Sequence, residues 1–531
     1  MNDFVPSELL DEKTLPPYLS AIPTVAERLG GHSSGWRVRE IGDGNVNYVF
    51  AVHGPAGRVC VKQAMPYVRV SGESWPLTPR RAYYEYRALV EHGRHVPARL
   101  PEVLHHDSRM NLLVTEHLSP HVVLRDGLRR GNRYPHLADH LAQYLVGSLF
   151  HTSDLAHAAI DKRPLVALFS GNHEMTQIME DMIFTEIYHE HGRNRWTSPQ
   201  LDDTVARLRD DVDLKVAVAR LKVRYLTCTE ALLHGDLHTG SILVTEDDTR
   251  VFDQEFACYG PIGFDVGTLL AHLLIGYFAQ DGPTVADPER TDRQTRLLQV
   301  VEDVWTGFAR GWAAAWEQPR QGDAYPRVLF DDADVLAGER ERHLAGIFTD
   351  SVGFCGAEII RRIIGMAHVA ELRAIEPDDA RARCEQRCLR LATHLLKHPH
   401  AHRSVRDLTD AARRCPNTAG CAFAFSSSYS RIHRDLGPSA ITSLAGTNTS
   451  RSSTAAVWVA CMAQSACPSS ATRPSAAAQS STTNNARSSE VTAPTKATSA
   501  SPHPVIHGMR PRSRQPSPTP SATTGGVGCR R

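Results

Sequence analysis

Apolar and polar positions alternate along three short stretches near the start of the chain, which predicts a small antiparallel β-sheet. These stretches are 36–41, 48–53 and 58–63. A glycine-rich segment, 42–47, joins the first two, and residues 54–57 predict a tight turn between the second and third. A fourth apolar stretch, 111–118, predicts another strand that ends at a hinge, and a short helix is expected near 25–29.

Apolar residues recur at spacings of three and four from about residue 136 to 224, as in Leu141, Leu145 and Leu149. This period is typical of helices with one buried face. Helical spacing returns after Pro261 and continues to about residue 396. The sequence therefore predicts an α+β protein with a small β-rich lobe over 1–118 and a larger, mostly helical lobe over 119–400.

The composition changes after about residue 400, where Ser, Thr, Ala, Pro and Arg dominate and the helical periodicity stops. Such a segment cannot bury enough apolar surface to offset the entropy lost on folding. We therefore predict a disordered tail over 401–531. One hypothesis is that the tail is translated in a shifted reading frame, and an intact neighbouring gene that does not overlap it would count against this.

The formal charge of the 531-residue chain is zero, but it is unevenly distributed. From Ala411 onward there are 13 Lys and Arg against 2 Asp and Glu, which leaves 46 basic and 57 acidic residues before that point. An acidic body gives no support to nucleic-acid binding. The basic tail lacks interleaved aromatic residues, so it is only a weak candidate for binding an acidic partner.

Cysteine spacing and hydropathy indicate the cellular compartment. The eleven cysteines show no paired Cys-x-x-Cys spacing, so no zinc site is expected. The first residues lack the basic and then apolar run of a signal peptide. The longest apolar stretch, 264–279, contains Asp265 and His272 and is too short and too polar for a membrane span. We predict a soluble, cytoplasmic protein that does not bind a membrane.

One stretch, 233–261, carries the clearest chemical signal. It is predicted as two strands joined by an acidic turn, with Asp236 in the loop before them and Asp253 and Glu255 in the segment after them. If that segment is extended, side chains two apart point the same way and present two carboxylates to one point. Mg²⁺ prefers such oxygen ligands, and Asp236 could accept a proton from a substrate hydroxyl. Phosphoryl transfer needs these groups, although an isolated Asp-x-Glu in a turn is usually a pair of solvated charges.

The glycine-rich hairpin contributes candidate phosphate ligands, because backbone amides in such a loop can cover nucleotide phosphates. The residues concerned are Gly42, Asp43, Gly44, Asn45 and Asn47. Lys62 follows on an alternating strand, in the position from which a kinase lysine holds α- and β-phosphates. Glu85, in the next predicted helix, is its candidate partner. Each feature alone has a simpler alternative. The hairpin could be purely structural, Lys62 could face solvent, and Glu85 could be a surface residue.

Two further features are candidates for ligand binding. The end of the fourth predicted strand, at Glu116, His117 and Leu118, occupies the position from which kinase backbones bind adenine. Trp75 lies in a loop flanked by proline, 71–78, which either packs locally or closes as a flap over a ligand.

Arg361 and Arg362 interrupt an otherwise apolar predicted helix. Arginine is rarely buried without a partner. The two residues therefore either form structural ion pairs or contact a sugar hydroxyl or a transferring phosphoryl group.

Taken together, the motifs resemble the 5-methylthioribose kinases, a branch of the aminoglycoside-phosphotransferase and choline-kinase-like superfamily. The matching segments are 41–47, 61–63, 72–77, 234–241, 253–256 with 260–261, and 361–365. The resemblance covers roughly 35–370 and implies a bilobal, protein-kinase-like fold. Ser241 stands where the wider superfamily has a metal-binding Asn, and Asp253-Gln254-Glu255 replaces Asp-Phe-Gly. Glu255 would then supply the oxygen ligand that Asn gives elsewhere. Gln254 stands where the branch typically has Pro, which should loosen the loop slightly.

The resemblance implies transfer of a phosphoryl group from ATP to the 1-hydroxyl of 5-methylthioribose, giving 5-methylthioribose 1-phosphate and ADP in methionine salvage. It also implies a homodimer that acts on a small-molecule sugar. The implied roles are proton acceptance or positioning for Asp236, Mg²⁺ binding for Asp253 and Glu255, ATP binding for Lys62 and the glycine-rich loop, substrate binding for Arg361 and Arg362, and closure for Trp75.

Two alternatives stay open. One is a related kinase for choline, homoserine or an aminoglycoside, but a cationic substrate calls for an acidic pocket and Arg361 and Arg362 argue modestly against it. The other is a catalytically inactive kinase fold that serves as a binding module. Lys62, Asp236 and the Asp253–Glu255 pair are all present, so nothing in the sequence requires inactivity.

Overall fold

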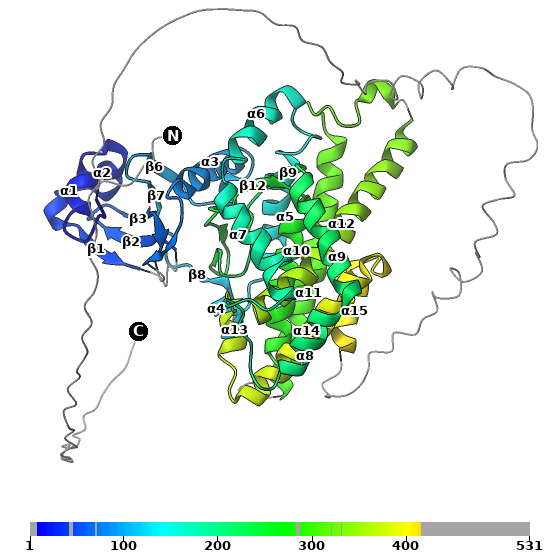
Figure 1. Cartoon of the computed structure of the whole chain (residues 1–531). Coiled ribbons are helices and arrows are strands. Elements are labelled where there is room, and N and C mark those ends of the chain that lie inside the picture. The colour runs from blue at the N-terminus through cyan, green and yellow to red at the C-terminus, as the bar shows by residue number, and fades with distance from the viewer. Residues whose placement is uncertain are drawn as a thin grey trace, which may run out of the picture. The chain divides into compact units, whose positions relative to one another are not determined.

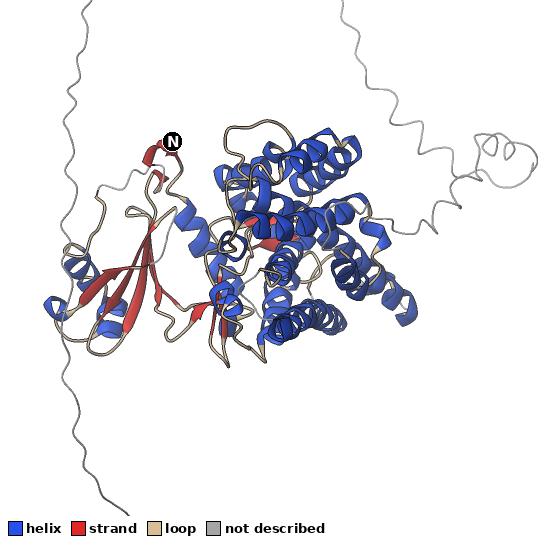
Figure 2. Cartoon of the chain, turned by 90° about the horizontal axis from the view of Figure 1, so that it is seen from below, coloured by secondary structure: helices blue, strands red, loops and turns tan. Residues whose placement is uncertain are grey.

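The structure is a computed structural model that describes residues 8–41, 46–69, 72–282, 287–319, 321–330 and 332–415. An N-terminal antiparallel sheet is followed by a mostly helical part (Figure 1). The α+β class expected from the sequence is confirmed. Figure 2 shows short helices directly beside the strands of the N-terminal sheet, and only short strands inside the larger helical part.

The N-terminal sheet has the strand order β1-β2-β3-β7-β6. Its strands are β1 (Arg37–Glu40), β2 (Tyr48–His53), β3 (Arg58–Gln63), β6 (Val103–Asp107) and β7 (Leu112–Glu116). Alternation along β3 places Val59 and Val61 in a buried cluster with Val114, and leaves Lys62 on the opposite face. Helices α1 (Leu15–Ser20) and α2 (Pro23–Leu29) contribute to the same cluster, while α3 (Arg81–Gly93) reaches Lys62 through Glu85.

Three small sheets shape the surroundings of the candidate site. Strand β9 (Ala231–Leu233) pairs with β12 (Cys258–Gly260), and β10 (Ile242–Val244) lies between β11 (Thr249–Val251) and β8 (Val122–Val123). The acidic turn predicted between β10 and β11 is present. Residues 72–76, expected as part of a loop around Trp75, form strand β5 (Gly72–Pro76), which pairs with β4 (Tyr67–Val68).

The helical part contains the long runs predicted by spacing. Its helices are α4 (Leu124–Arg129), α5 (Leu137–Leu145), α6 (Ala159–Phe169), α7 (His173–Phe184), α8 (Asp202–Asp210), α9 (Val212–Thr227), α10 (Ile262–Ala279), α11 (Asp287–Glu317), α12 (Ala333–Ile364), α13 (Ala370–Arg373), α14 (Asp378–Lys397) and α15 (Val405–Arg414). Short 3-10 or π turns connect several of them.

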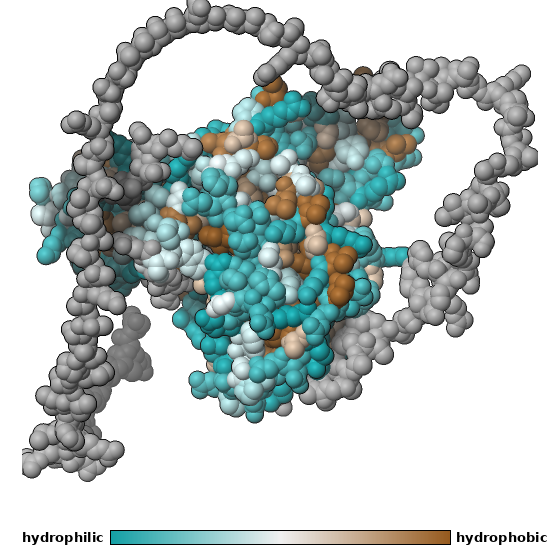
Figure 3. Space-filling view, in the orientation of Figure 1, coloured by the Kyte–Doolittle hydropathy of each residue, from teal (hydrophilic) through white to brown (hydrophobic). Residues whose placement is uncertain are grey.

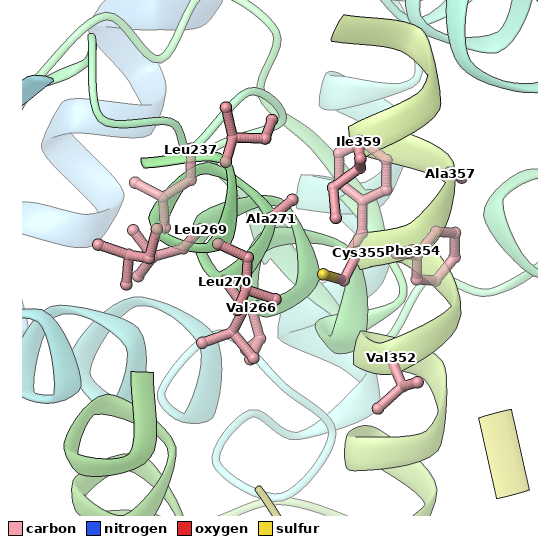
Figure 4. Close-up of a cluster of buried hydrophobic side chains, with 14 of the residues drawn as sticks. Leu237, Val266, Leu269, Leu270, Ala271, Val352, Phe354, Cys355, Ala357 and Ile359 are labelled. Carbon is pink, nitrogen blue, oxygen red and sulfur yellow. The ribbon is translucent and has the colours of Figure 1, made fainter. Parts of the chain in front are cut away.

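Helices α10 and α12 form the centre of this part, and Figure 4 shows apolar side chains of both helices that belong to one buried cluster. Gly263 and Gly267 permit the close approach, because a Cβ on Gly267 would lie 2.5 Å from the Ser351 carbonyl oxygen. Helix α10 is long and apolar enough to cross a membrane by length and composition, but it is almost wholly buried in the core. It is therefore a core helix, and the cytoplasmic location stays a prediction.

The predicted tail begins too early. Residues 405–414, which the composition assigned to the tail, form helix α15. Ser404 and Asp407 make a reciprocal capping box at its start, and Leu408 and Ala411 are buried in the main core. The composition argument averaged this short amphipathic segment with the residues that follow. Residues 416–531 lie outside the described part of the chain.

Candidate active site

The loop after β9 is fixed in place by the start of α10. The backbone amides of His234 and Gly235 donate to the two carboxylate oxygens of Asp265, at 2.6 and 3.0 Å. Gly235 has φ +85°, and a Cβ there would lie 2.2 Å from the Phe256 carbonyl oxygen, so only glycine fits without strain. His234 Nε2 also contacts the carbonyl oxygen of Phe252 at 2.9 Å. The loop that carries Asp236 is thus bound both to α10 and to the segment after β11.

Asp236 meets the two arginines of α12. Its Oδ1 accepts hydrogen bonds from terminal guanidinium nitrogens of Arg361 at 2.6 Å and Arg362 at 2.8 Å. Burial by itself would raise the pKa of Asp236, but the two positive charges outweigh it and hold that pKa well below its usual range. Asp236 is therefore an ionised hydrogen-bond acceptor and a weak base.

His238 faces the other oxygen of Asp236. Its Nδ1 accepts the backbone N–H of Gly240 at 2.8 Å, which places the ring proton of the neutral imidazole on Nε2. Nε2 lies 3.5 Å from Asp236 Oδ2, longer than a hydrogen bond. Burial and the nearby Arg362 keep the pKa of His238 well below its usual value, although Asp236 opposes this shift. Asp236 Oδ2 thus faces the neutral imidazole of His238 and can still accept a hydrogen bond from a hydroxyl group.

Glu358 lies behind the two arginines, one turn earlier on α12. Its side chain is 1% exposed and accepts from Nε of Arg361 and Nε of Arg362, both at 2.7 Å. His272, from α10, contacts the same carboxylate at 3.2 Å through Nε2. The adjacent arginines hold the pKa of Glu358 well below its usual value despite burial.

Lys62 is at the centre of a second charged group, on the sheet side of the site. Its Nζ lies 2.8 Å from Glu85 and 3.7 Å from Glu255, and it also contacts Asp253. Burial lowers the pKa of Lys62, but the three carboxylates more than compensate and raise it. Burial raises the pKa values of Glu85 and Glu255, and the neighbouring Asp253 adds to that rise. Lys62 and Arg81, whose Nε lies 3.7 Å from Glu255, therefore supply two positive charges against three carboxylates.

The acidic segment after β11 differs from the expected geometry. We expected Asp253 and Glu255 on one face of an extended segment, but residues 252–254 form a loop, a turn follows at 255–256, and Asp253 has φ +74°. The carboxylates nevertheless converge, since ligand oxygens of Glu85, Asp253 and Glu255 all lie within 4.8 Å of one another. A non-glycine residue with positive φ is uncommon and often marks a functional site. This oxygen-rich group fits a hard divalent cation.

Asn47 connects the glycine-rich segment to this acidic group. Its Nδ2 donates to Glu255 Oε2 at 2.7 Å, and its Oδ1 accepts from Arg81 Nε at 2.9 Å. Arg81 is fully buried and also donates to the carbonyl oxygens of Met65 and Thr78. The other candidate residues of the segment, Gly42, Asp43, Gly44 and Asn45, lie outside the described residues.

The remaining candidates lie around these two groups. Trp75 is half-buried on β5, and the guanidinium of Arg193 sits 5.0 Å from its ring centroid. Glu116 is the last residue of β7, and its backbone N–H donates to the Glu102 carbonyl oxygen at 2.9 Å. His117 packs against His53 at 5.5 Å between ring centroids, and Leu118 is partly exposed. Their roles in ligand binding stay predictions.

Ser241 turns toward its own loop. Its hydroxyl donates to the carbonyl oxygens of Asp236 and His238, at 3.1 and 2.9 Å. The side chain therefore stabilises the loop, which is consistent with Glu255 rather than Ser241 completing the acidic group.

Sequence reasoning missed four contributing residues: Arg81, His238, Asp265 and Glu358. Glu358 could have been found, because it lies three and four positions before Arg361 and Arg362, where side chains on a helix meet. Asp265 follows Gly263 at the start of a predicted helix, where a carboxylate can accept backbone N–H groups. Arg81 had no comparable local signal.

Comparisons with known proteins show which family the chain resembles over most of its length. The profile of the phosphotransferase enzyme family matches residues 37–327. Methylthioribose kinase 1 of Oryza sativa subsp. japonica is 41% identical over 399 residues, which are 75% of this chain and 93% of that protein. Methylthioribose kinase of Escherichia coli O45:K1 (strain S88 / ExPEC) is 40% identical over 417 residues, 78% of this chain and 100% of that protein.

Solved structures are more distant. A Plasmodium vivax ethanolamine kinase covers 72% of this chain and 90% of its own, with 12% identity and a TM-score of 0.39. The fold class follows from the elements described above, and the family follows from the sequence relatives.

Proposed function

Because the chain belongs to the methylthioribose kinases within the phosphotransferase enzyme family, we propose that it phosphorylates the 1-hydroxyl of 5-methylthioribose with ATP. The products are 5-methylthioribose 1-phosphate and ADP. ATP is the phosphoryl donor that family membership implies. The substrate is a small sugar, as the names of the relatives indicate.

Asp236 is the proposed acceptor for the substrate hydroxyl. Oδ1 already accepts from both arginines, so the 1-hydroxyl would donate to Oδ2. The hydroxyl oxygen forms the new bond to the γ-phosphorus, the bond from that phosphorus to the β–γ bridging oxygen breaks, and the hydroxyl proton passes to Oδ2. With its depressed pKa, Asp236 acts first by orienting the hydroxyl and accepts the proton late, as a loose transition state permits.

Lys62, Asp253 and Glu255 are the proposed nucleotide side of the site. Lys62 would exchange part of its carboxylate contact for the α- and β-phosphates. Asp253 and Glu255 would hold Mg²⁺, which neutralises phosphate charge when bound. Glu85 would then remain as the partner that fixes Lys62. We propose the same nucleotide-binding role for the backbone of 42–45 and for the hinge at Glu116, His117 and Leu118. Trp75 is proposed to close over the ligand.

Two observations together carry the proposal: Asp236 pairs with two buried arginines, and an acidic group surrounds Lys62. A cationic acceptor such as choline would meet Arg361 and Arg362 at the proposed acceptor position, where like charges repel. A sugar hydroxyl meets no such penalty.

The test is release of ADP from Mg-ATP with 5-methylthioribose, choline, homoserine and an aminoglycoside in parallel. We expect turnover with 5-methylthioribose that is lost in Asp236→Asn. Turnover only with another alcohol would overturn the substrate assignment. Nucleotide binding without turnover of any acceptor would favour an inactive binding module.

We also propose a homodimer, which the family resemblance implies. Helix α9 offers a surface for it: Val212, Val216, Ala219, Val223 and Leu226 are exposed at alternating spacings of four and three. This spacing is that of a coiled-coil seam, so two copies could pair along α9. Figure 3 shows hydrophobic surface where Figure 1 labels α9.

Light scattering tests the dimer. The wild type should have twice the mass of one chain, and Val216→Glu with Val223→Glu should give monomers. Val328→Glu, at a residue that is 83% exposed elsewhere on the surface, is the matched control and should remain dimeric. A monomeric wild type would overturn the dimer, and a dimeric double variant would overturn the α9 surface.

A further inference from the structure

Buried Glu358 contacts Arg361 and Arg362 of its own helix and His272 of α10. Its Oε2 accepts from Arg361 Nε at 2.7 Å. Its Oε1 accepts from Arg362 Nε at 2.7 Å and from Arg361 NH2 at 3.1 Å, and lies 3.2 Å from His272 Nε2. A buried carboxylate is costly unless its oxygens are satisfied, and here both are.

Each of the two guanidinium groups contacts both carboxylates, and both groups do so through the same atoms. Each uses its Nε edge for Glu358 and a terminal nitrogen for Asp236 Oδ1. The four groups together carry no net charge. Without Glu358, two buried positive charges would face one carboxylate, and the Nε of each guanidinium would lose its acceptor.

His272 ties this arrangement to the second helix. It comes from α10, is 3% exposed, and its ring centroid lies 5.1 Å from that of His238. The contact to Glu358 therefore links the α10–α12 core directly to the loop that carries Asp236. Movement of α12 against α10 would be transmitted to both arginines.

We infer that Glu358, supported by His272, is a positioning residue that holds Arg361 and Arg362 as a pair aimed at the acceptor site. This inference rests on the proposed function, since it assigns the arginine pair to the acceptor and the transferring phosphoryl group. Glu358 touches neither substrate nor nucleotide. It acts by fixing the Nε edges, so that the terminal nitrogens meet Asp236 and the developing charge with little reorganisation.

The first experiment compares Glu358→Gln with the wild type. An amide retains the shape but removes the negative charge and one acceptor oxygen. We expect kcat with 5-methylthioribose to fall about 10- to 100-fold, the size typical of residues that orient a functional group from behind. The KM for ATP should change less than about twofold, because the Lys62 group is separate.

Glu91→Gln is the matched control. Glu91 is also a buried glutamate that bridges two arginines, Arg87 of its own helix at 3.1 Å and Arg94 directly after that helix. It lies on α3, away from Asp236, and its loss should leave kcat within about twofold of the wild type.

A double-mutant cycle separates positioning from general stability. If Glu358 acts through the arginines, Glu358→Gln should cost little further kcat in an Arg361→Ala, Arg362→Ala background. The inference would be overturned if Glu358→Gln lowered kcat by the same factor in the double-alanine background as in the wild type. It would also be overturned if Glu358→Gln raised the KM for ATP by as large a factor as it lowered kcat. If Glu358→Gln does not fold, His272→Asn decides: a fall in kcat of about 3- to 10-fold with an unchanged KM for ATP supports it, and an unchanged kcat overturns it.

Wild-type turnover is measured first, because this separates a failure of the proposed function from a failure of the positioning role of Glu358. No wild-type activity with 5-methylthioribose counts against the proposed function. Full activity in Glu358→Gln counts against the positioning role alone.

Discussion

Asn47 donates a hydrogen bond from Nδ2 to Glu255 Oε2 at 2.7 Å, across 208 positions of sequence. The same side chain accepts from the buried Arg81. One amide therefore satisfies a buried cation and a buried carboxylate, and it joins the end of the glycine-rich segment to the acidic group around Lys62.

Asn47→Ala should weaken nucleotide binding. The change leaves Glu255 Oε2 and Arg81 Nε without this partner, and an unsatisfied buried polar group costs about 1–3 kcal/mol. We expect the KM for Mg-ATP to rise about 10-fold, with a smaller change for 5-methylthioribose. Steady-state kinetics measure both constants, and exposed Asn132→Ala is the control. An unchanged KM for Mg-ATP would contradict the proposed link.

On the acid side, the loss of activity with falling pH should begin at higher pH when Arg362 is removed. Arg361 and Arg362 keep the pKa of Asp236 below its usual 3.8, while burial alone would raise it. The ion pairs therefore contribute to the free energy of unfolding above about pH 3.8, and that contribution is lost as pH falls further. In Arg362→Ala, protonation of Asp236 should occur at higher pH. The profile of kcat/KM against pH should lose activity at higher pH than in the wild type, whereas Arg28→Ala, at a partly exposed residue on α2, should not shift it.

Divalent metal should stabilise the protein through the acidic group. Binding only to the folded state adds about 2.7 kcal/mol to the free energy of unfolding when the ligand is at 100 times its Kd. We expect Mg²⁺ with ATP to raise the Tm of the wild type more than ATP with a chelator does. Asp253→Asn and Glu255→Gln should lose most of this metal-dependent gain. Calorimetry measures it, and an equal gain in both variants would argue against these ligands.

The glycines of α10 should respond oppositely to alanine. At Gly267, a Cβ would lie 2.5 Å from the Ser351 carbonyl oxygen and 2.9 Å from the Cys355 nitrogen, so α12 must shift. Overpacking of this kind costs about 1–3 kcal/mol of the free energy of unfolding. At Gly276 no atom lies within 4 Å, and alanine should stabilise the helix by about 0.5–1 kcal/mol. Denaturant unfolding tests both, and equal effects would show that the close approach of the helices does not matter.

Helix α15 sets where the chain can be shortened. A protein that ends at residue 415 should keep the activity and Tm of the full chain. A protein that ends at residue 404 should lose several degrees of Tm, because Val405 and Leu408 leave the core and the loss of such buried apolar side chains costs about 1.5–3 kcal/mol each. Similar Tm values for the two shortened proteins would contradict this boundary.

Local patterns predicted most elements of the fold. Alternation located β2 and β3, and spacing of three and four located the helical part, because both depend on which face of one element is buried. The same reasoning placed the tail too early at 401, since the apolar face of α15 has a counterpart only when the core is present. Trp75 was expected in a loop, and its pairing on β5 depends on β4.

The sequence by itself determined the chemical groups and the family, because His234–Gly235–Asp236, Asp253, Glu255 and the arginine pair are local motifs. Only the tertiary structure decided how they meet. Arg361 reaches Asp236 across 125 positions because α12 packs against α10, and Asp253 joins Lys62 through a backbone turn that alternation did not predict. Such contacts depend on the packing of whole elements, which no short stretch of sequence encodes.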